Sequence, residues 1–308
     1  MLLVRDELSR TATPGDHAIS IGVFDGVHGG HRMLIGRLLD EARTRGLTGG
    51  VVTFHPHPVT VVHPDIEFSY IESLERRVEL LRDLGAAFVS VLTFTSELQQ
   101  VSAADFTRLL VEEACMRLLV VGEDFRLGRG GVGTVERLRE IGEEQGFEVI
   151  AVPLLADAGA VDRISSTRVR EALAAGNMDD VSAFLGRPYA IRGPVLHGEE
   201  RGRQIGFRTL NVGVSPDRAL PPNGVYVTRA LVGERTYCAV TNIGTRPTFD
   251  GRNTTVETHL LDFEGDLYGY VVTVELLHRL RGEQKLDGLD ALSAQIAQDV
   301  QETREWFA

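Results

Sequence analysis

A chain of 308 residues, of which 43% are hydrophobic, is longer than one compact core usually requires and predicts two folded domains. The net charge of −12 argues against general attraction to nucleic acid or anionic lipid, so any anionic ligand has to meet a locally positive site. No apolar run is long enough to cross a membrane and the first residues lack a signal-peptide pattern, which predicts a cytoplasmic protein without membrane or nucleic-acid partners.

The basic residues and cysteines narrow the possible chemistry. Lys285 is the only lysine, and arginines supply the rest of the 32 basic residues. A phosphate-binding loop of the pattern GxxxxGK[ST] is therefore absent, and ATP would have to be held by histidine, arginine, hydroxyl groups, backbone N–H groups and metal. Cys115 and Cys238 lie far apart in the chain, which favours two buried free thiols in a reducing compartment over a disulfide.

The first half of the chain alternates short apolar runs with amphipathic ones. Strands are predicted at 18–24, 50–54, 87–92, 117–122 and 148–153, and helices at 31–44, 73–84, 102–114, 134–145, 166–175 and 179–185. Ser73, Ser102 and Thr134 fit helix N-caps, while Gly85 and Gly146 fit positions that follow a helix. This alternation predicts an α/β domain over residues 1–186, with a parallel sheet covered by helices on both faces.

After Pro188 the pattern changes to β-rich segments broken by glycine and proline. Strands are predicted at 189–197, 207–212, 224–232, 236–243, 255–262 and 270–279, followed by a single helix at 288–307. The pattern indicates a second domain over residues 187–308. We expect a small antiparallel β-barrel with the terminal helix packed outside it.

The first motif with chemical meaning is Asp25-Gly26-Val27-His28-Gly29-Gly30-His31, between a predicted strand and a predicted helix. The start of a helix attracts phosphate through its unpaired N–H groups and the positive end of its dipole. There, His28 and His31 can donate hydrogen bonds to phosphate oxygens as charge builds on the α-phosphorus of ATP and pyrophosphate leaves. Two histidines three residues apart are otherwise more often incidental polar residues or metal ligands, but the strand, the glycines and the helix start favour phosphate.

Three more polar stretches follow predicted strands, where ligands collect in open parallel sheets. They are Phe54-His55-Pro56-His57-Pro58, Gly122-Glu123-Asp124-Phe125-Arg126 and Arg163-Ile164-Ser165-Ser166-Thr167-Arg168. A zinc site at His55, His57 and His63 is the weaker interpretation of the first stretch, because no cysteine is near and the prolines indicate a rigid loop. The serines and threonine of the third stretch cap the next helix, and beside Arg163 they also form an anion site.

Together, GVFDGVHGGHR, TFHPHPV, VGEDFRLG and ISSTRVREAL resemble the adenylyltransferase half of bacterial bifunctional riboflavin kinase/FAD synthetases, over residues 15–186. The resemblance implies a Rossmann-like nucleotidyltransferase fold that moves AMP from ATP onto FMN. It implies phosphate binding and catalysis by His28, His31 and Arg163, ATP contacts from Gly22, Phe24, Asp25, Ser166 and Thr167, and flavin contacts from Phe54, His57, Pro58 and Asp124. Gly29-Gly30 and Glu123 depart from the family pattern but leave the matched positions intact.

One glycine-rich segment, Gly128-Arg129-Gly130-Gly131-Val132-Gly133, matches the dinucleotide-binding pattern GxGxxG. Its first glycine comes six residues after Gly122, whereas a dinucleotide-binding loop turns directly at the strand end. We therefore expect a mobile glycine loop beside the flavin site, and not the cofactor loop of a dehydrogenase.

The second domain carries GPVLHGEERGRQIGFRTLN, a glycine- and arginine-rich segment, followed by TNIGTRPT and ETHLLDF. Alone, the first segment fits a surface loop as well as a loop that covers phosphate. Over residues 187–305, the segments together resemble the riboflavin kinase half of the same family. The resemblance implies ATP contacts from Gly198 and Arg203, magnesium and phosphate ligation by Thr209 and Asn211, a flavin contact from Arg281, and Glu257 as the general base for the terminal ribityl hydroxyl.

Two substitutions separate this chain from the family pattern at the predicted phosphate-binding strand. Arg208 stands where the family usually has proline, and Leu210 where it usually has alanine. Because side chains alternate along a strand, Phe207, Thr209 and Asn211 would share one face, with the two substituted residues on the other. The pattern predicts a kinase whose ligands are intact but whose ATP binding is weakened.

The two halves together predict a bifunctional, magnesium-dependent enzyme that converts riboflavin to FMN with ATP, and then FMN to FAD with release of pyrophosphate. One alternative is a monofunctional FAD synthetase whose barrel binds flavin without phosphorylating it, and another is a non-catalytic flavin-sensing protein. His28, His31 and Arg163 argue against the sensor for the first domain. Arg208 and Leu210 leave both alternatives open for the second.

Overall fold

The computed structural model describes residues 2–153, 164–197, 207–248, 251–285 and 287–308. The chain folds into two compact units, residues 1–166 and 167–308. In the second unit, α9 (Met178–Leu185) follows α8 (Ser166–Ala175) and packs against two barrel strands. The sequence instead predicts a boundary after residue 186, which gives both helices to the first domain, and that boundary stays a prediction.

The first unit is built on a five-stranded parallel sheet with the order β3-β2-β1-β4-β5. Its strands are β1 (His17–Ile21), β2 (Thr48–His55), β3 (Phe88–Thr93), β4 (Met116–Gly122) and β5 (Glu148–Val152). The predicted Rossmann-like sheet is confirmed. The chain builds outward from β1 in one direction through β2 and β3, and in the other through β4 and β5, so the order reverses between β1 and β4.

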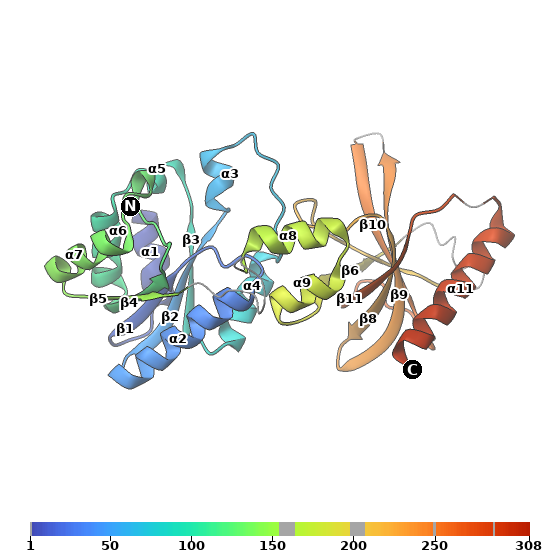
Figure 1. Ribbon diagram of the computed structural model, residues 1–308, viewed down its shortest axis with the longest axis horizontal. Coiled ribbons are helices and arrows are strands. Elements are labelled where there is room, and N and C mark those ends of the chain that lie inside the picture. The colour runs from blue at the N-terminus through green and yellow to red at the C-terminus, as the bar shows by residue number, and fades with distance from the viewer. Residues whose placement is uncertain (1, 154–163, 198–206, 249–250, 286) are drawn as a thin grey trace. The chain divides into compact units, whose positions relative to one another are not determined.

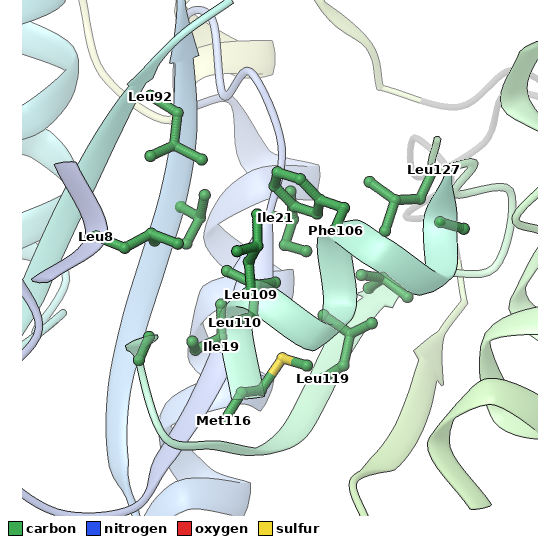
Figure 2. Close-up of a cluster of buried hydrophobic side chains, with 14 of the residues drawn as sticks. Leu8, Ile19, Ile21, Leu92, Phe106, Leu109, Leu110, Met116, Leu119 and Leu127 are labelled. Atoms are coloured by element: carbon green, nitrogen blue, oxygen red, sulfur yellow. The ribbon is translucent and has the colours of Figure 1, made fainter. Parts of the chain in front are cut away.

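Helices cover both faces of this sheet (Figure 1). One face carries α2 (Gly29–Arg45) and α4 (Leu74–Asp83), and the other carries α1 (Leu2–Thr11), α6 (Ala103–Glu113) and α7 (Val135–Gln145). Because side chains alternate along a strand, Ala18 packs toward α2, while Ile19 and Ile21 pack toward α6. Figure 2 shows the second of these two cores, in which Leu109 and Leu110 of α6 lie beside the isoleucines of β1.

Helix boundaries follow the predicted caps. The side chains of Ser73, Ser102 and Thr134 each accept a hydrogen bond from the backbone N–H three residues later. Gly85, with φ of 106°, follows the end of α4, and Gly146, with φ of 79°, caps α7 in the left-handed region that suits glycine. Short elements lie between the longer ones: α3 (Pro58–Val62), α5 (Ser96–Gln99) and the 3₁₀ helix η1 (Arg129–Gly131).

The second unit contains a closed six-stranded barrel in which all pairings are antiparallel, as predicted. Its strands are β6 (Tyr189–Leu196), β7 (Leu210–Val212), β8 (Gly224–Val232), β9 (Arg235–Thr248), β10 (Gly251–Leu260) and β11 (Val271–Gly282). Buried hydroxyl groups of Thr228, Thr241 and Thr258 are linked at 2.8 and 3.0 Å across β8, β9 and β10. The terminal helix α11 (Leu289–Phe307) packs against β9 and β8.

Both cysteines are free thiols, as predicted, but they are not both buried. Cys115 is exposed because it forms the turn between α6 and β4, where its backbone has φ of 43°. Among the helices that the structure describes, none is both long and apolar enough to span a bilayer.

Candidate active sites

The turn after β1 places the two histidines of the first motif. Phe24 and Val27 have φ of 56° and 42°, a left-handed conformation that non-glycine residues rarely adopt. The ring of Phe24 folds over Gly22, where an added Cβ would lie 3.0 Å from the ring. This turn makes His28 the N-cap of α2 and places His31 in its first turn, where the helix N–H groups have no partner within the helix.

The two imidazole rings lie against each other. The ring centroids of His28 and His31 are 3.7 Å apart with an interplanar angle of 21°, and the edge of Phe24 lies 5.2 Å from His31. Burial, then the neighbouring His28 and the Arg77 cation, lower the pKa of His31 well below its usual value. The lowered pKa favours the neutral form of His31, which carries one N–H donor.

A cavity of about 290 Å³ opens at the carboxyl ends of β1, β4 and β5, where the strand order reverses. Ligands of open α/β sheets bind at such a reversal. Six of the predicted site residues line it: Gly22, Phe24, His28, His31, Asp124 and Ser166. Asp124, predicted at the flavin, thus shares a cavity with the histidines. Thr167 is exposed and is not among the described lining residues, and Arg163 lies outside the described residues.

Asp25 is buried beside this cavity, where it holds two loops together. Its carboxylate accepts hydrogen bonds of 3.1 Å from the backbone N–H groups of Ile71 and Glu72. Its carbonyl accepts a bond of 2.8 Å from the Ser166 hydroxyl. Asp25 is 1% exposed and is not among the described residues that line the cavity. Asp25 therefore supports the turn that carries the two histidines and does not line the cavity itself.

A second, apolar cavity of about 300 Å³ lies in the same unit. Phe54 lines it, with Phe94 and Phe106 at ring-centroid distances of 5.7 and 6.2 Å from Phe54. The glycine-rich segment around η1 forms another wall through Gly128, Gly130 and Gly131.

The turn that follows Phe54 is held by polar contacts. The backbone N–H of His57 donates to the Tyr70 hydroxyl at 2.7 Å, and the His57 ring accepts from the Val59 N–H at 3.1 Å. These contacts make His57 the N-cap of α3 and Pro58 its first residue. Neither residue is among the described residues that line the apolar cavity.

In the barrel, the predicted base and one predicted ligand lie on neighbouring strands. Glu257 of β10 pairs with Asn211 of β7 on one side and with Asn242 of β9 on the other. Directly opposed residues on antiparallel strands have Cβ atoms about 4.5–5.5 Å apart and share a face. Thr258, the next residue, is buried inside the barrel, so the row of Asn211, Glu257 and Asn242 occupies the outer face.

A pocket of about 160 Å³ is lined by Arg208, Thr209 and Leu210, which directly precede Asn211 in the chain, and by Asp266 and Tyr268, among others. The predicted strand start at residue 207 is wrong, because β7 begins only at Leu210, and the alternation of faces expected for Phe207 to Thr209 stays a prediction. The backbone carbonyl of Arg208 accepts a bond of 2.8 Å from Nδ1 of His259, which fixes this non-strand approach.

Arg281, predicted at the flavin, forms a bidentate ion pair with Asp299 of α11 at 2.8 and 2.7 Å. These hydrogen bonds raise the pKa of Arg281. The guanidinium thereby fastens α11 to the end of β11, and its predicted flavin contact stays untested. Gly198 and Arg203 lie outside the described residues.

The family models for FAD synthetase and riboflavin kinase match residues 10–168 and 185–307. The bifunctional riboflavin kinase/FMN adenylyltransferase of Escherichia coli (strain K12) is 39% identical over 310 residues, covering 100% of this chain and 98% of the relative. The enzyme of that name from Bacillus subtilis (strain 168) is 34% identical over 311 residues, covering 99% and 95%. The chain belongs to the bifunctional riboflavin kinase/FMN adenylyltransferase family.

A solved structure from Streptococcus pneumoniae, which carries the name macrolide-efflux protein, shares the fold of this chain. The TM-score is 0.89, with 32% sequence identity and 97% of each chain covered. The likeness therefore extends over both units of the chain.

Three features near the candidate sites were not predicted from the sequence as site features. Phe94 and Phe106 look like ordinary core residues in the sequence, yet they wall the apolar cavity. Asn242 stands in the quoted segment TNIGTRPT, but only strand register reveals that it faces Glu257. Arg77 has the sequence context of a surface residue on an amphipathic helix, although it is completely buried.

Two weaker interpretations of the sequence can be compared with the structure. Within the part of the chain that the structure describes, no group of three or more His, Cys, Asp and Glu side chains is placed to hold a metal, including His55, His57 and His63. The GxGxxG segment lines the aromatic cavity instead of following β4 in a tight turn.

Proposed function

We propose that this enzyme makes FAD in two ATP-dependent steps, each carried out by one unit. The barrel phosphorylates riboflavin to FMN, and residues 1–166 transfer AMP from a second ATP to that FMN. Family membership supports both activities. The assignment of adenylyl transfer to the first unit rests on the cavity that joins His28 and His31 at the strand-order reversal.

In adenylyl transfer, an oxygen of the FMN phosphate attacks the α-phosphorus of ATP. The bond from the α-phosphorus to the bridging oxygen breaks, and pyrophosphate leaves. His28 and His31 donate hydrogen bonds to the phosphate oxygens as charge builds there, and the N-terminus of α2 adds its dipole. Arg163, Ser166 and Thr167 are proposed contacts for the departing pyrophosphate.

The apolar cavity is proposed as the site of the flavin ring system. Phe54 packs edge-to-face against Phe94 and at a tilt against Phe106, so the walls offer ring faces and edges for aromatic contact. Phe54 would contact the ring, with His57 and Pro58 on the adjoining turn. Asp124 would accept hydrogen bonds from ribityl hydroxyl groups.

In the kinase step, the terminal ribityl oxygen of riboflavin attacks the γ-phosphorus of ATP and ADP leaves. Glu257 takes the proton from that hydroxyl, and its position opposite Asn211 on the outer face of the barrel supports this role. Gly198 and Arg203 are proposed to cover the phosphates, Arg281 is proposed to contact the flavin, and Thr209 lines the pocket proposed for ATP.

Magnesium is proposed for both steps, and Thr209 and Asn211 are its proposed ligands in the barrel. Their side-chain oxygens are neutral, which suits an ion that is held mainly by ATP phosphates and water. Bound there, magnesium would supply positive charge to the phosphate groups.

We also propose the predicted division after residue 186 and a cytoplasmic location. Free thiols at Cys115 and Cys238 agree with a reducing compartment. Limited proteolysis tests the division, because cleavage near 186 supports it and a first cleavage near 166 contradicts it. Cell fractionation tests the location, and recovery of the protein outside the cytoplasm contradicts it.

The two activities are tested by incubating the purified protein with riboflavin, ATP and magnesium and separating the flavins. The proposal predicts FMN first and FAD later. Failure to form FMN would contradict the proposed kinase activity, and failure to convert added FMN to FAD would contradict the proposed adenylyltransferase activity.

A further inference from the structure

A completely buried arginine lies between the two loops that form the cavities of the first unit. Arg77 of α4 is 0% exposed. Its Nη1 donates a hydrogen bond of 2.9 Å to the carbonyl of Val23, and its Nη2 donates one of 3.2 Å to the carbonyl of Phe54. Arg77 is not among the described residues that line either cavity, so it acts on substrates indirectly, through these two carbonyls and through its charge, which helps to lower the pKa of His31.

The two carbonyls stand where β1 and β2 stop pairing. The last backbone bond between these strands runs from the Gly22 N–H to the Val52 carbonyl, at 3.1 Å. Carbonyls alternate in direction along a strand, so the Phe54 carbonyl points to the same side as that of Val52, where β1 has ended. The Arg77 guanidinium supplies the donor that the next residue of β1 would have supplied.

Each carbonyl belongs to the loop that builds one cavity. Val23 precedes Phe24 and the turn that carries the stacked histidines of the first cavity. Phe54 lines the apolar cavity and begins the turn to Pro58. The Thr53 hydroxyl also donates to the Val23 carbonyl at 2.9 Å, which strengthens the same junction. One rigid, planar group thus spans the start of both loops.

An arginine in this interior carries a desolvation cost. Burial lowers the pKa of Arg77, an effect that the Asp25 carboxylate opposes. Its Nε has no hydrogen-bond partner among the described residues. A long apolar side chain would fill the same interior without the desolvation of a charge, but it would take the Arg77 donors away from the Val23 and Phe54 carbonyls. The geometry of the bridge accounts for the residue better than its contribution to packing.

We propose that Arg77 is a positioning residue for adenylyl transfer, whose guanidinium fixes the ATP cavity relative to the flavin cavity. This inference rests on the proposed function of the first unit. Transfer requires the attacking FMN oxygen and the departing pyrophosphate to lie in line through the α-phosphorus. A displacement of about 1 Å in such an arrangement lowers the rate by about 10²-fold.

The test compares Arg77→Met, which removes both bonds, with Arg77→Lys, which keeps the charge but cannot bridge two carbonyls as a planar fork does. For Arg77→Met we expect kcat of FMN adenylylation to fall by about 10²-fold, with Arg77→Lys between it and the wild type. Calorimetric dissociation constants for ATP and for FMN, each measured alone, should stay close to wild-type values. Riboflavin kinase activity should not change.

Arg82→Met is the matched control, because Arg82 is an exposed arginine of the same helix, and it should keep the wild-type kcat. A wild-type kcat in folded Arg77→Met or Arg77→Lys overturns the inference. So does a loss explained by a smaller folded fraction or by weakened binding of either substrate, since that indicates a purely structural residue. If Arg77→Met does not fold, Arg77→Lys decides alone.

His31→Ala, assayed in parallel, distinguishes a failure of the proposed function from a failure of the role proposed for Arg77. If His31→Ala adenylylates FMN at the wild-type rate, the proposed function of the first cavity fails. If His31→Ala is inactive while both Arg77 variants are fully active, only the role of Arg77 fails.

Discussion

The two proposed sites of this enzyme are held in place by different means. In the first unit, buried polar groups fix the loops: Asp25 is 1% exposed, Arg77 is 0% exposed, and both hold backbone groups of neighbouring loops. In the barrel, Glu257 and Asn211 are half-buried on an outer face and are placed by strand register. The first site therefore depends on interior interactions, whereas the second depends on sheet geometry.

The largest effect is expected for a substitution in the barrel that leaves the activity of the first unit unchanged. Glu257→Gln keeps the shape of the side chain but removes the base, so riboflavin phosphorylation should fall by about 10²–10⁴-fold. Conversion of added FMN to FAD should continue unchanged. Chromatographic separation of the flavins measures both rates, and an equal fall in both would break the comparison between two independent sites.

The converse variant is His31→Ala. It removes a donor to the phosphate oxygens in the first cavity, and adenylylation of FMN should fall by at least about 10²–10³-fold. Phosphorylation of riboflavin by the same preparation serves as the control and should be unaffected. Wild-type FAD formation would show that the stacked histidines do not act on ATP.

Asp25→Asn tests whether the first unit depends on buried charge. The neutral amide loses a charge-assisted contact with two backbone N–H groups, and the free energy of unfolding should fall by about 2 kcal/mol. Urea unfolding followed by circular dichroism should show a shift of one transition. Trp306, the single tryptophan, lies in α11 of the second unit, so its fluorescence transition should not move. A shift seen only by Trp306 would contradict the account.

Arg208→Pro combined with Leu210→Ala tests the approach to β7 in the barrel. These changes restore the usual family residues in the approach to β7, beside the pocket lined by Thr209. Proline fixes φ there, and alanine removes bulk opposite the buried Thr258. We expect kcat/KM for riboflavin phosphorylation to rise while adenylyl transfer stays constant. Equal or lower kinase efficiency in a folded double variant would contradict the prediction.

The smallest expected effect is a pH dependence of stability that belongs to the first unit. The pKa of His31 lies well below its usual value of 6.5, so in the window between these two values the unfolded chain binds a proton that the folded protein does not. Stability should therefore rise with pH through that window and level off above about 6.5. His31→Asn should reduce the slope, which is at most about 1.4 kcal/mol per pH unit for one group. An unchanged slope would contradict this origin.

Sequence patterns predicted most of the fold. The period of hydrophobic residues indicates which face of an element is buried, and capping residues indicate where helices begin and end. Ser102 and Thr134 look like caps and are caps. The segments 2–11, 58–62 and 96–99 were not predicted as helices, because they are short or their periodicity is weak.

The candidate sites were less accessible to sequence reasoning. A motif such as His28 to His31 contains its own context, since the strand end and helix start lie next to it. Arg77 differs in this respect: nothing distinguishes it in sequence from exposed Arg82, because its two carbonyl partners lie 23 and 54 residues away. Asn242 also escapes detection, because cross-strand neighbours are set by register, which depends on the whole barrel.

The claim that two separate sites each carry one step is tested most directly by mixing two variants. His31→Ala and Glu257→Gln are incubated with riboflavin, ATP and magnesium, alone and together, and the flavins are separated. We expect FMN without FAD from His31→Ala alone, neither product from Glu257→Gln alone, and FAD from the mixture. FAD from either variant alone, or its absence from the mixture, would contradict the account.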